Sequence, residues 1–502
     1  MSSLWINTTE DFRSFEKLSK DVECDVCIIG AGLTGLATAY YLSNQGLKVV
    51  ILEKMPFICE QASGNTGAKI TSQHGLFYKY LIDEFGKDYA LQYLNANNQA
   101  IQDIKNIVQS ENIDCDLIDE DNYVYTTDEN EVIKIKHENI AVNSLGFNSE
   151  FVTESPLPFE IKAAIQFPNQ AQFHPRKYCI GLLKSILKKN TKIHNNTNVV
   201  DIQKDFDNYV VFTESNRVTC KYAVMATKYP FINAPGFYFL KMYQSTSFYI
   251  AIRPNAEIFD GMYISSAEPI YAFRTAMYNN EKVLLIGGNT IKTGSVSNLE
   301  NAYMPLENKA KELFPNCEIL FRWNTEDSVS LDKIPYIGTF SNFTPNLYVA
   351  TGYDKWGMTT SHVAAKIISD EILGIPNPNK YVFQATRFGP IKNKAETGNM
   401  LKQAANSIAL KKPITPISSI NQMSNDSGSL VEIDGEKIGI YKDTSGNIFA
   451  IDPICKHLGC LLSWNNLEKT WDCPCHGSRY DYMGNNIYGP ATKDLDKSSK
   501  DL

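Results

Sequence analysis

The sequence lacks the features that would place it in several broad functional classes. No run of apolar residues reaches the ~18 that a membrane-spanning helix needs, which predicts that the chain has no membrane span. The net charge is −8, without the basic excess that binds nucleic acid or an anionic membrane, so we expect no nucleic-acid partner. Residues 1–21 are polar and acidic and do not resemble a secretory signal, which predicts a cytoplasmic location. A length of 502 residues predicts about two to four domains.

What is present is most specific near the C-terminus, where two short boxes combine cysteine with histidine. The letters CKHLGC occupy 455–460, and CPCHGS occupy 473–478. A Rieske [2Fe–2S] centre holds one iron by two thiolates and the other by two imidazoles, which is the residue set that these boxes supply. The expected metal ligands are Cys455 and Cys473 for one iron, and His457 and His476 for the other.

Zinc is the alternative for these boxes, because two cysteines and two histidines also suit a tetrahedral zinc ion. Against zinc, the first two ligands are only two residues apart, and each box carries a further cysteine, Cys460 or Cys475. The boxes and the letters GPA at 489–491 closely resemble the Rieske family. In its respiratory-complex members, that resemblance implies a Cys460–Cys475 disulfide, and hydrogen bonds from Ser478 and Tyr480 to sulfur. Such donors predict a potential in the upper half of the range of roughly −150 to +300 mV.

The second signature lies near the N-terminus and is typical of a dinucleotide-binding fold. An apolar strand at 24–29 leads into the letters GAGLTG at 30–35, and a helix-like segment and a second strand then end at Glu53. The glycines, Gly30, Gly32 and Gly35, allow a tight turn and let a pyrophosphate approach the helix N-terminus. We expect Glu53 to bind the ribose hydroxyls of an adenosine. This pattern alone fits either FAD or NAD.

Further segments decide between these cofactors, because they resemble the D-amino-acid-oxidase superfamily of flavoproteins in the same order along the chain. The segments are 62–67, 197–199, 222–227 and 346–358. They correspond to the loop after the ribose acid, the segment that holds adenine, the strand that returns under the flavin, and the strand and turn near its ring. The resemblance covers most of 20–390 and implies FAD. The further cofactor-binding residues that it implies are Ser63, Val199, Ala226, Thr227, Gly352, Gly357 and Met358.

These patterns together predict an α/β FAD-binding domain of the Rossmann type with an inserted α+β substrate domain, followed by a small all-β Rieske domain. The flavoprotein part is expected over 1–395, and the resemblance places the inserted substrate domain at about 88–168 and 235–322. A linker that begins with a helix is expected over 396–415. Short strands separated by turns then predict the Rieske domain over 416–502.

Four residues are candidates for the substrate site. Arg274 lies on an otherwise apolar strand, so it is either an anchor for an acidic substrate group or a member of an internal salt bridge. His74 follows the flavin loop and is a candidate proton acceptor or site of covalent flavin attachment, although a hydrogen-bonded histidine in a turn is the favoured alternative. For Tyr353 and Trp356, the superfamily resemblance implies a place beside the flavin ring.

A flavin next to a Rieske cluster predicts an electron-transferring enzyme, because a substrate gives two electrons to a flavin whereas the cluster accepts one. The flavin would pass electrons singly to the cluster and on to an unknown one-electron acceptor. The sequence has only one dinucleotide fingerprint, which favours direct oxidation of a substrate. The superfamily resemblance suggests a small amine or amino acid, and hence a dehydrogenase acting on CH–NH bonds.

The sequence leaves alternatives to this function. The chain could be a reductase or electron-transfer component supplied by NAD(P)H or a carrier protein, or a redox sensor. A Rieske oxygenase is disfavoured, because it needs a separate iron held by two histidines and a carboxylate. The seven histidines leave no helix with two suitably spaced ligands for that iron.

Overall fold

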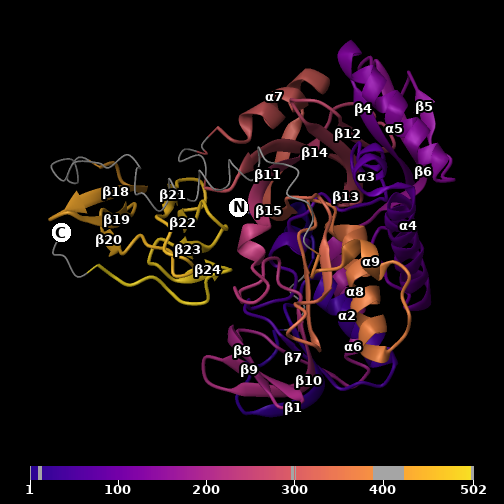
Figure 1. Ribbon diagram of the computed structural model, residues 1–502. Coiled ribbons are helices and arrows are strands. Elements are labelled where there is room, and N and C mark those ends of the chain that lie inside the picture. The colour runs from indigo at the N-terminus through magenta and orange to yellow at the C-terminus, as the bar shows by residue number, and fades with distance from the viewer. Residues whose placement is uncertain (1, 10–13, 295–298, 300, 388–422, 499–502) are drawn as a thin grey trace.

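The computed structural model describes residues 2–9, 14–294, 299, 301–387 and 423–498. Figure 1 shows a large α/β body formed by the chain up to residue 387, with a smaller, all-β body from residue 423 onward beside it. The predicted linker, 396–415, lies outside the described residues. No helix in the described ranges is long and apolar enough to cross a bilayer.

The first sheet of the large body contains apolar strands that are buried on both faces. The fully buried sequence VVIL of β2 is an example, and such runs are typical of parallel sheets covered on both sides. The strands lie in the order β16-β17-β10-β1-β2-β7, with the β8–β9 hairpin attached to β10. Their bounds are β1 (Val22–Ile29), β2 (Val49–Leu52), β7 (Thr191–His194), β8 (Val199–Asp205), β9 (Asn208–Thr213), β10 (Arg217–Met225), β16 (Tyr336–Thr339) and β17 (Leu347–Thr351).

Four helices pack together beside this sheet. Helix α2 begins directly after the glycine turn and buries every residue except Tyr41 and Asn44. Its small residues allow close contact with α6 and α8, and α8 in turn contacts α4. The bounds are α2 (Leu33–Asn44), α4 (Lys87–Ser110), α6 (Pro175–Ile186) and α8 (Gly357–Leu373). The predicted Rossmann-type strand–turn–helix unit is therefore present, and its turn opens at the carboxyl ends of the strands.

A nine-stranded sheet forms the other half of the large body, in the order β15-β11-β14-β13-β12-β4-β6-β3, with β5 paired to β6. The parallel pairing of β12 with β4 joins strands from the two segments expected to form the substrate domain. The bounds are β3 (Lys69–Ile70), β4 (Ile118–Thr126), β5 (Glu150–Val152), β6 (Ala163–Gln172), β11 (Met242–Arg253), β12 (Met262–Ser265), β13 (Tyr271–Tyr278), β14 (Glu281–Lys292) and β15 (Glu318–Ser330). The remaining helices of this body are α1 (Leu4–Asn7), α3 (Tyr78–Phe85), α5 (Val132–Ser144), α7 (Met304–Leu313) and α9 (Lys380–Phe383).

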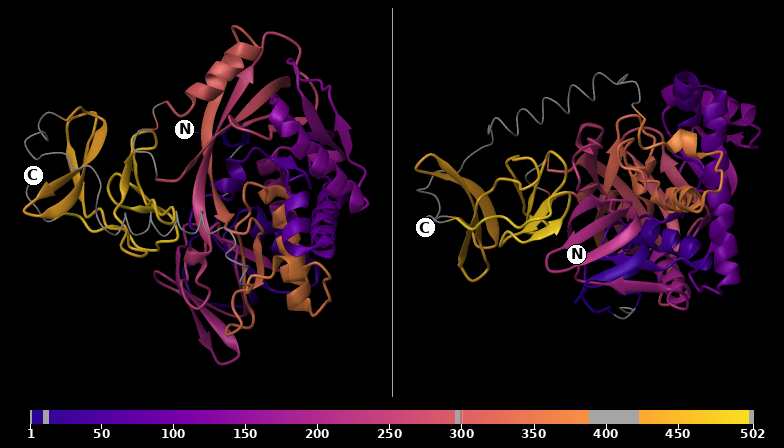
Figure 2. Two further views of the ribbon diagram at one scale, coloured as in Figure 1. Left: turned by 45° about the horizontal axis from the view of Figure 1, so that its top comes forward. Right: turned by 60° about the horizontal axis from the view of Figure 1, so that its bottom comes forward.

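The small body contains two antiparallel sheets, which agrees with the predicted all-β domain. Figures 1 and 2 show the four-stranded sheet next to the large body and the three-stranded sheet farther away. The buried rings of Trp464 and Trp471 pack against each other in its core, with centroids 4.9 Å apart. The bounds are β18 (Ser427–Ile433), β19 (Glu436–Lys442), β20 (Ile448–Ile451), β21 (Ser463–Asn465), β22 (Thr470–Asp472), β23 (Arg479–Asp481) and β24 (Asn486–Tyr488).

Candidate functional site

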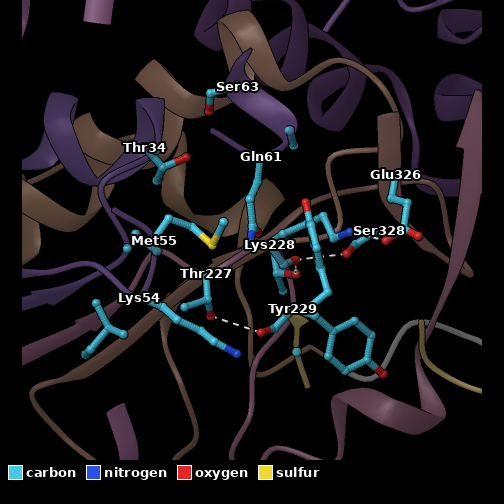
Figure 3. A pocket seen from close by; sticks show the side chains of 18 of the residues that line it. Thr34, Lys54, Met55, Gln61, Ser63, Thr227, Lys228, Tyr229, Glu326 and Ser328 are labelled. Carbon is cyan, nitrogen blue, oxygen red and sulfur yellow. Dashed lines mark hydrogen bonds and ion pairs between the residues drawn. The ribbon is translucent and has the colours of Figure 1, made fainter. Parts of the chain in front are cut away.

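A cavity lies at the carboxyl ends of β1, β2, β10 and β17, the edge at which open α/β sheets bind ligands. Figure 3 shows part of this cavity, with side chains reaching it from several elements. Every predicted cofactor-binding residue except Gly35 lines it: Gly30, Gly32, Glu53, Ser63, Val199, Ala226, Thr227, Gly352, Gly357 and Met358. These residues come from segments far apart in the sequence, so the fold brings the predicted set together around one space.

The glycines of the first turn are required by close backbone contacts. Gly30 has a φ of +105°, and a Cβ there would lie 2.9 Å from the Ala226 carbonyl oxygen. A Cβ on Gly35 would lie 2.0 Å from the Gly30 carbonyl oxygen. Gly35 therefore lets the helix pack against the turn, which explains why it is absent from the cavity wall. Backbone amides at the start of α2 are left close to the cavity, as an anionic ligand requires.

Glu53 is held in the cavity wall by backbone amides. Its carboxylate accepts hydrogen bonds from Ala31 N at 2.6 Å and from Met55 N at 2.9 Å. Burial raises the pKa of Glu53, whereas these amide hydrogen bonds lower it. A fixed carboxylate beside the glycine turn fits the two hydroxyl donors of a ribose.

The two histidines of the cysteine-rich boxes present their Nδ1 atoms for coordination. Nε2 of His476 is 3.2 Å from the Phe239 carbonyl oxygen, and Nε2 of His457 is 2.6 Å from Asn233 Oδ1. Since a carbonyl oxygen only accepts, Nε2 carries the proton and the lone pair is on Nδ1. Both Nδ1 atoms are buried without a hydrogen-bond partner among the described residues. This arrangement fits iron binding through Nδ1.

Burial also keeps both imidazoles neutral, as a metal ligand must be. It lowers the pKa of His457 to about 3, with the nearby His476 contributing, and it lowers the pKa of His476 to about 4. The ring centroids are 4.9 Å apart and the rings are perpendicular. In the Cys455–Cys473 pair, the hydrogen bond between the thiols lowers the pKa of Cys455 and raises that of Cys473, so Cys455 is the more readily deprotonated of the two predicted iron ligands.

The other cysteines of the boxes form a disulfide between Cys460 and Cys475. These two sulfurs lie close to that of Cys473, but as disulfide partners they do not supply thiolates to a metal. Tyr480 Oη is 3.5 Å from Cys455 Sγ and accepts a hydrogen bond from Lys456 N. Ser478 Oγ accepts from Ala491 N at 3.0 Å, which leaves its own proton available to a cluster sulfur.

The cavity and the cluster-ligand site share a residue at their boundary. Tyr229 lines the cavity, and its buried ring lies with its centroid 6.1 Å from that of His476. Figure 3 shows Tyr229 next to Thr227 and Lys228, whose segment is held by hydrogen bonds. Thr227 Oγ1 donates to the Tyr229 carbonyl oxygen, and Ser328 Oγ donates to that of Lys228.

Arg274 is not among the described residues that line the cavity. Its guanidinium is buried and hydrogen-bonds the backbone carbonyl oxygens of Gly67, Ala68, Phe173 and Thr275. Burial lowers the pKa of Arg274 to about 9. The predictions of a substrate anchor and of an internal salt bridge are therefore both corrected. The guanidinium neither faces the cavity nor pairs with a carboxylate, because it already donates to backbone carbonyl oxygens.

His74 is buried, and both of its ring nitrogens are engaged. Nε2 donates to the Thr71 carbonyl oxygen at 2.9 Å, so Nδ1 accepts from Tyr93 Oη at 2.6 Å. These contacts argue against His74 as a proton acceptor or flavin attachment site. Trp356 stacks on His74 with centroids 4.8 Å apart and does not line the cavity. Of the four substrate-site candidates, Tyr353 alone reaches the cavity wall.

Several cavity residues have no signal in the sequence. Lys228 and Asp327 line the cavity from segments that the motifs do not include. Residues 486–489, 491 and 492 line it from the small body, more than 400 positions after the glycine turn. Asn233 and Phe239, which accept hydrogen bonds from the two histidines, lie in a segment without a recognisable sequence motif. Only the three-dimensional fold brings these residues to the site.

Comparisons with known proteins agree with this division of the chain. A family model described as "FAD dependent oxidoreductase" (DAO) matches residues 25–371, and one described as "Rieske [2Fe-2S] domain" matches 414–499. A Rieske 2Fe-2S iron-sulfur protein of Bacillus subtilis, YhfW, is 37% identical over 97% of this chain and 96% of its own. The gamma-glutamylputrescine oxidoreductase of Escherichia coli is 22% identical over 74% of this chain and 89% of its own.

Solved structures share the fold of the large body. Glycine oxidase from Geobacillus kaustophilus has a TM-score of 0.62 at 18% identity, covering 73% of this chain and 99% of its own. L-proline dehydrogenase from P. horikoshii has a TM-score of 0.61 at 17% identity, covering 73% of this chain and 98% of its own.

Proposed function

Since this chain belongs to the DAO family of FAD-dependent oxidoreductases and carries a C-terminal Rieske [2Fe–2S] domain, we propose that it oxidises a small amine or amino acid. The chain binds FAD and a [2Fe–2S] cluster. In the proposed reaction it acts as a dehydrogenase on a CH–NH bond, and the electrons pass singly through the cluster to an external one-electron acceptor. FAD supplies two-electron oxidation of the substrate, and the cluster supplies one-electron transfer.

The observation that carries this proposal is the shared boundary of the two cofactor sites. Tyr229 lines the FAD cavity and packs near His476, a predicted ligand of the cluster. The same loop meets the other ligand histidine through Asn233. Two redox sites that adjoin within one chain support electron transfer inside the molecule, without a diffusing carrier between them.

One carboxylate of the cavity supports a basic substrate. Within the described residues, no hydrogen bond engages the carboxylate of Asp327, which lines the cavity. Among the lysines of the cavity, Lys228 pairs with the Glu326 carboxylate, whereas Lys54 and Lys355 donate to the neutral side chains of Asn486 and Thr290. A protonated amine would pair with the Asp327 carboxylate. The name of the gamma-glutamylputrescine oxidoreductase, a relative along most of the flavoprotein part, also supports an amine substrate.

The test is an anaerobic titration of the iron-replete protein with a panel of amines and amino acids. Absorbance follows flavin bleaching, and EPR follows the reduced cluster. We expect one class of amine to bleach the flavin and to produce the Rieske signal. If no amine does so while NADH or a reduced carrier protein reduces both centres, the chain is a reductase and the amine proposal fails. If no donor gives turnover but partner binding depends on redox state, the sensor alternative replaces it.

A further inference from the structure

The FAD cavity is built from both bodies of the protein. Glu53, Val199 and the glycine turn form one part of its wall, and Asn486, Ile487, Tyr488, Gly489, Ala491 and Thr492 of the Rieske domain form another. Strand β24 and the loop after it therefore lie against the end of the cavity where the ribose acid is found. Figure 1 shows β24 at the side of the Rieske domain that faces the flavoprotein.

Hydrogen bonds hold this Rieske segment to residues that directly adjoin the predicted adenosine site. Lys54, which follows Glu53, donates from Nζ to the Asn486 carbonyl oxygen at 2.5 Å and also to Asn486 Oδ1. Asn198, which precedes Val199, donates from Nδ2 to the Thr492 carbonyl oxygen at 3.2 Å. Burial lowers the pKa of Lys54 to about 8.

A buried ion network crosses between the two bodies farther along the cavity. Lys228 Nζ is 2.8 Å from Glu326 Oε2, and Arg479 of the Rieske domain is 2.9 Å from Glu326 Oε1. Arg479 also pairs with Asp472 in its own domain at 2.9 Å. The Lys228 ammonium lies 3.8 Å from the centroid of the Tyr488 ring, a cation–π contact. Both Lys228 and Tyr488 line the cavity, so the network fixes two sides of its wall relative to each other.

The bodies also approach each other closely at the backbone. A Cβ on Gly477, next to His476, would lie 2.5 Å from Gln244 Cγ, and one on Gly294 would lie 2.7 Å from Pro474 Cα. Contacts between the two bodies are thus found both at the cavity and at the cluster ligands, where Asn233 and Phe239 accept hydrogen bonds from the two histidines.

We propose that the docked Rieske domain is part of the FAD-binding site, with β24 and residues 489–492 closing the adenosine end of the cavity. FAD then contacts both domains, so cofactor binding and domain docking stabilise each other. This coupling is reciprocal: FAD strengthens domain docking by the same factor by which docking strengthens FAD binding. The proposal concerns cofactor retention, and it holds whichever substrate the enzyme oxidises.

The test compares the wild type with the double variant Asn486→Ala/Tyr488→Ala. The readout is the rate at which FAD leaves the holoprotein, followed by the rise in flavin fluorescence. We expect release to be about tenfold faster in the double variant, equivalent to ~1.4 kcal/mol. The Rieske EPR spectrum and the iron content check that the domain remains folded. Glu432→Ala, at an exposed position on β18 in the outer sheet, is the matched control and should release FAD at the wild-type rate.

A second measurement does not depend on any variant. Hydrogen exchange of the backbone amides of β24 is compared in the wild-type protein with FAD bound and after FAD has been removed. We expect slower exchange with FAD bound, because β24 contacts the cofactor and opens less often. Equal FAD release from the double variant and the wild type, or β24 exchange that does not respond to FAD, would overturn the proposal.

Discussion

The ring of Tyr229, in the wall of the FAD cavity, lies 6.1 Å between centroids from the ring of His476, a predicted iron ligand. The tyrosine is therefore a side chain at which the two cofactor sites adjoin. Its hydroxyl is buried and has no hydrogen-bond partner among the described residues, so its packing rather than a polar contact defines its position.

Replacing Tyr229 should slow electron transfer to the cluster without preventing substrate oxidation. We expect Tyr229→Leu to leave the rate of flavin bleaching close to that of the wild type while delaying the Rieske signal. Tyr229→Phe keeps the ring and removes only the hydroxyl, so it should behave like the wild type. Anaerobic stopped-flow absorbance combined with rapid-freeze EPR measures both rates. A Leu variant with an undelayed Rieske signal would contradict a role for this contact.

The hydroxyls near the cluster sulfurs should control its potential. Tyr480 Oη lies 3.5 Å from Cys455 Sγ, and a hydrogen bond to sulfur stabilises the reduced, more negative cluster. Tyr480→Phe and Ser478→Ala should each lower the potential by about 50 mV, since a hydrogen bond worth ~1 kcal/mol corresponds to about 45 mV for one electron. A redox titration followed by EPR measures the shift. Tyr482→Phe, in the same domain, serves as the control.

Arg274 should matter for stability and not for substrate binding. Arg274→Ala leaves buried carbonyl oxygens of Gly67, Ala68 and Phe173 without their donor. We expect a loss of about 2–4 kcal/mol in the free energy of unfolding, as for other unsatisfied buried polar groups. Denaturant unfolding measures this loss, and steady-state kinetics should show an unchanged KM. A raised KM in a variant of normal stability would restore the anchor role that the sequence suggested.

Asp327 should destabilise the apoprotein at neutral pH. Burial raises the pKa of Asp327 to about 6, from 3.8 for the ordinary group. Between about pH 4 and pH 6, Asp327 is ionised in the unfolded chain but still protonated in the folded protein. Its contribution to the free energy of unfolding therefore falls as the pH rises through this range. Asp327→Asn should therefore be more stable than the wild type above pH 6, by at most about 3 kcal/mol, and equal to it below pH 4.

Thermal unfolding of the FAD-free proteins between pH 4 and pH 8 measures this difference. In the holoenzyme, the same substitution should raise the KM for an amine substrate, because the carboxylate that would pair with the amine is gone. Ser328→Ala, a neighbour on the same strand, is the control and should show no pH-dependent gain in stability. A pH-independent difference between Asp327→Asn and the wild type would show that Asp327 does not titrate in this range.

The sequence predicts most where neighbours along the chain determine the structure. The GAGLTG turn forms because Gly30 adopts a positive φ and Gly35 packs against the Gly30 carbonyl oxygen within the same strand–turn–helix unit. The two cysteine–histidine boxes likewise contain all four predicted cluster ligands, and the Cys460–Cys475 disulfide expected from the family resemblance is present. Local spacing is sufficient for such features, because the required chemistry limits the residues to a few types.

The sequence predicts least where partners come from distant segments or from the backbone. The partners of Arg274 are backbone carbonyl oxygens of two loops and of its own strand, and every residue carries a carbonyl, so no letter in the sequence marks them. His74 has a side chain that can act as a base, and only its contacts with Thr71 and Tyr93 show that both ring nitrogens are occupied. The contribution of Tyr488 to the FAD cavity depends on how two domains dock, which no motif in either domain encodes.

The orientation of the cluster histidines determines how the molecule is connected to its surroundings. Both Nε2 atoms face the flavoprotein loop, where Asn233 Oδ1 and the Phe239 carbonyl oxygen accept their hydrogen bonds. The histidine side of the cluster therefore faces the flavoprotein part and is positioned to receive electrons from the flavin of the same chain. We expect an external acceptor to bind another side of the Rieske domain. Electrons would then pass from flavin to cluster to acceptor, and substrate and acceptor would bind at separate surfaces.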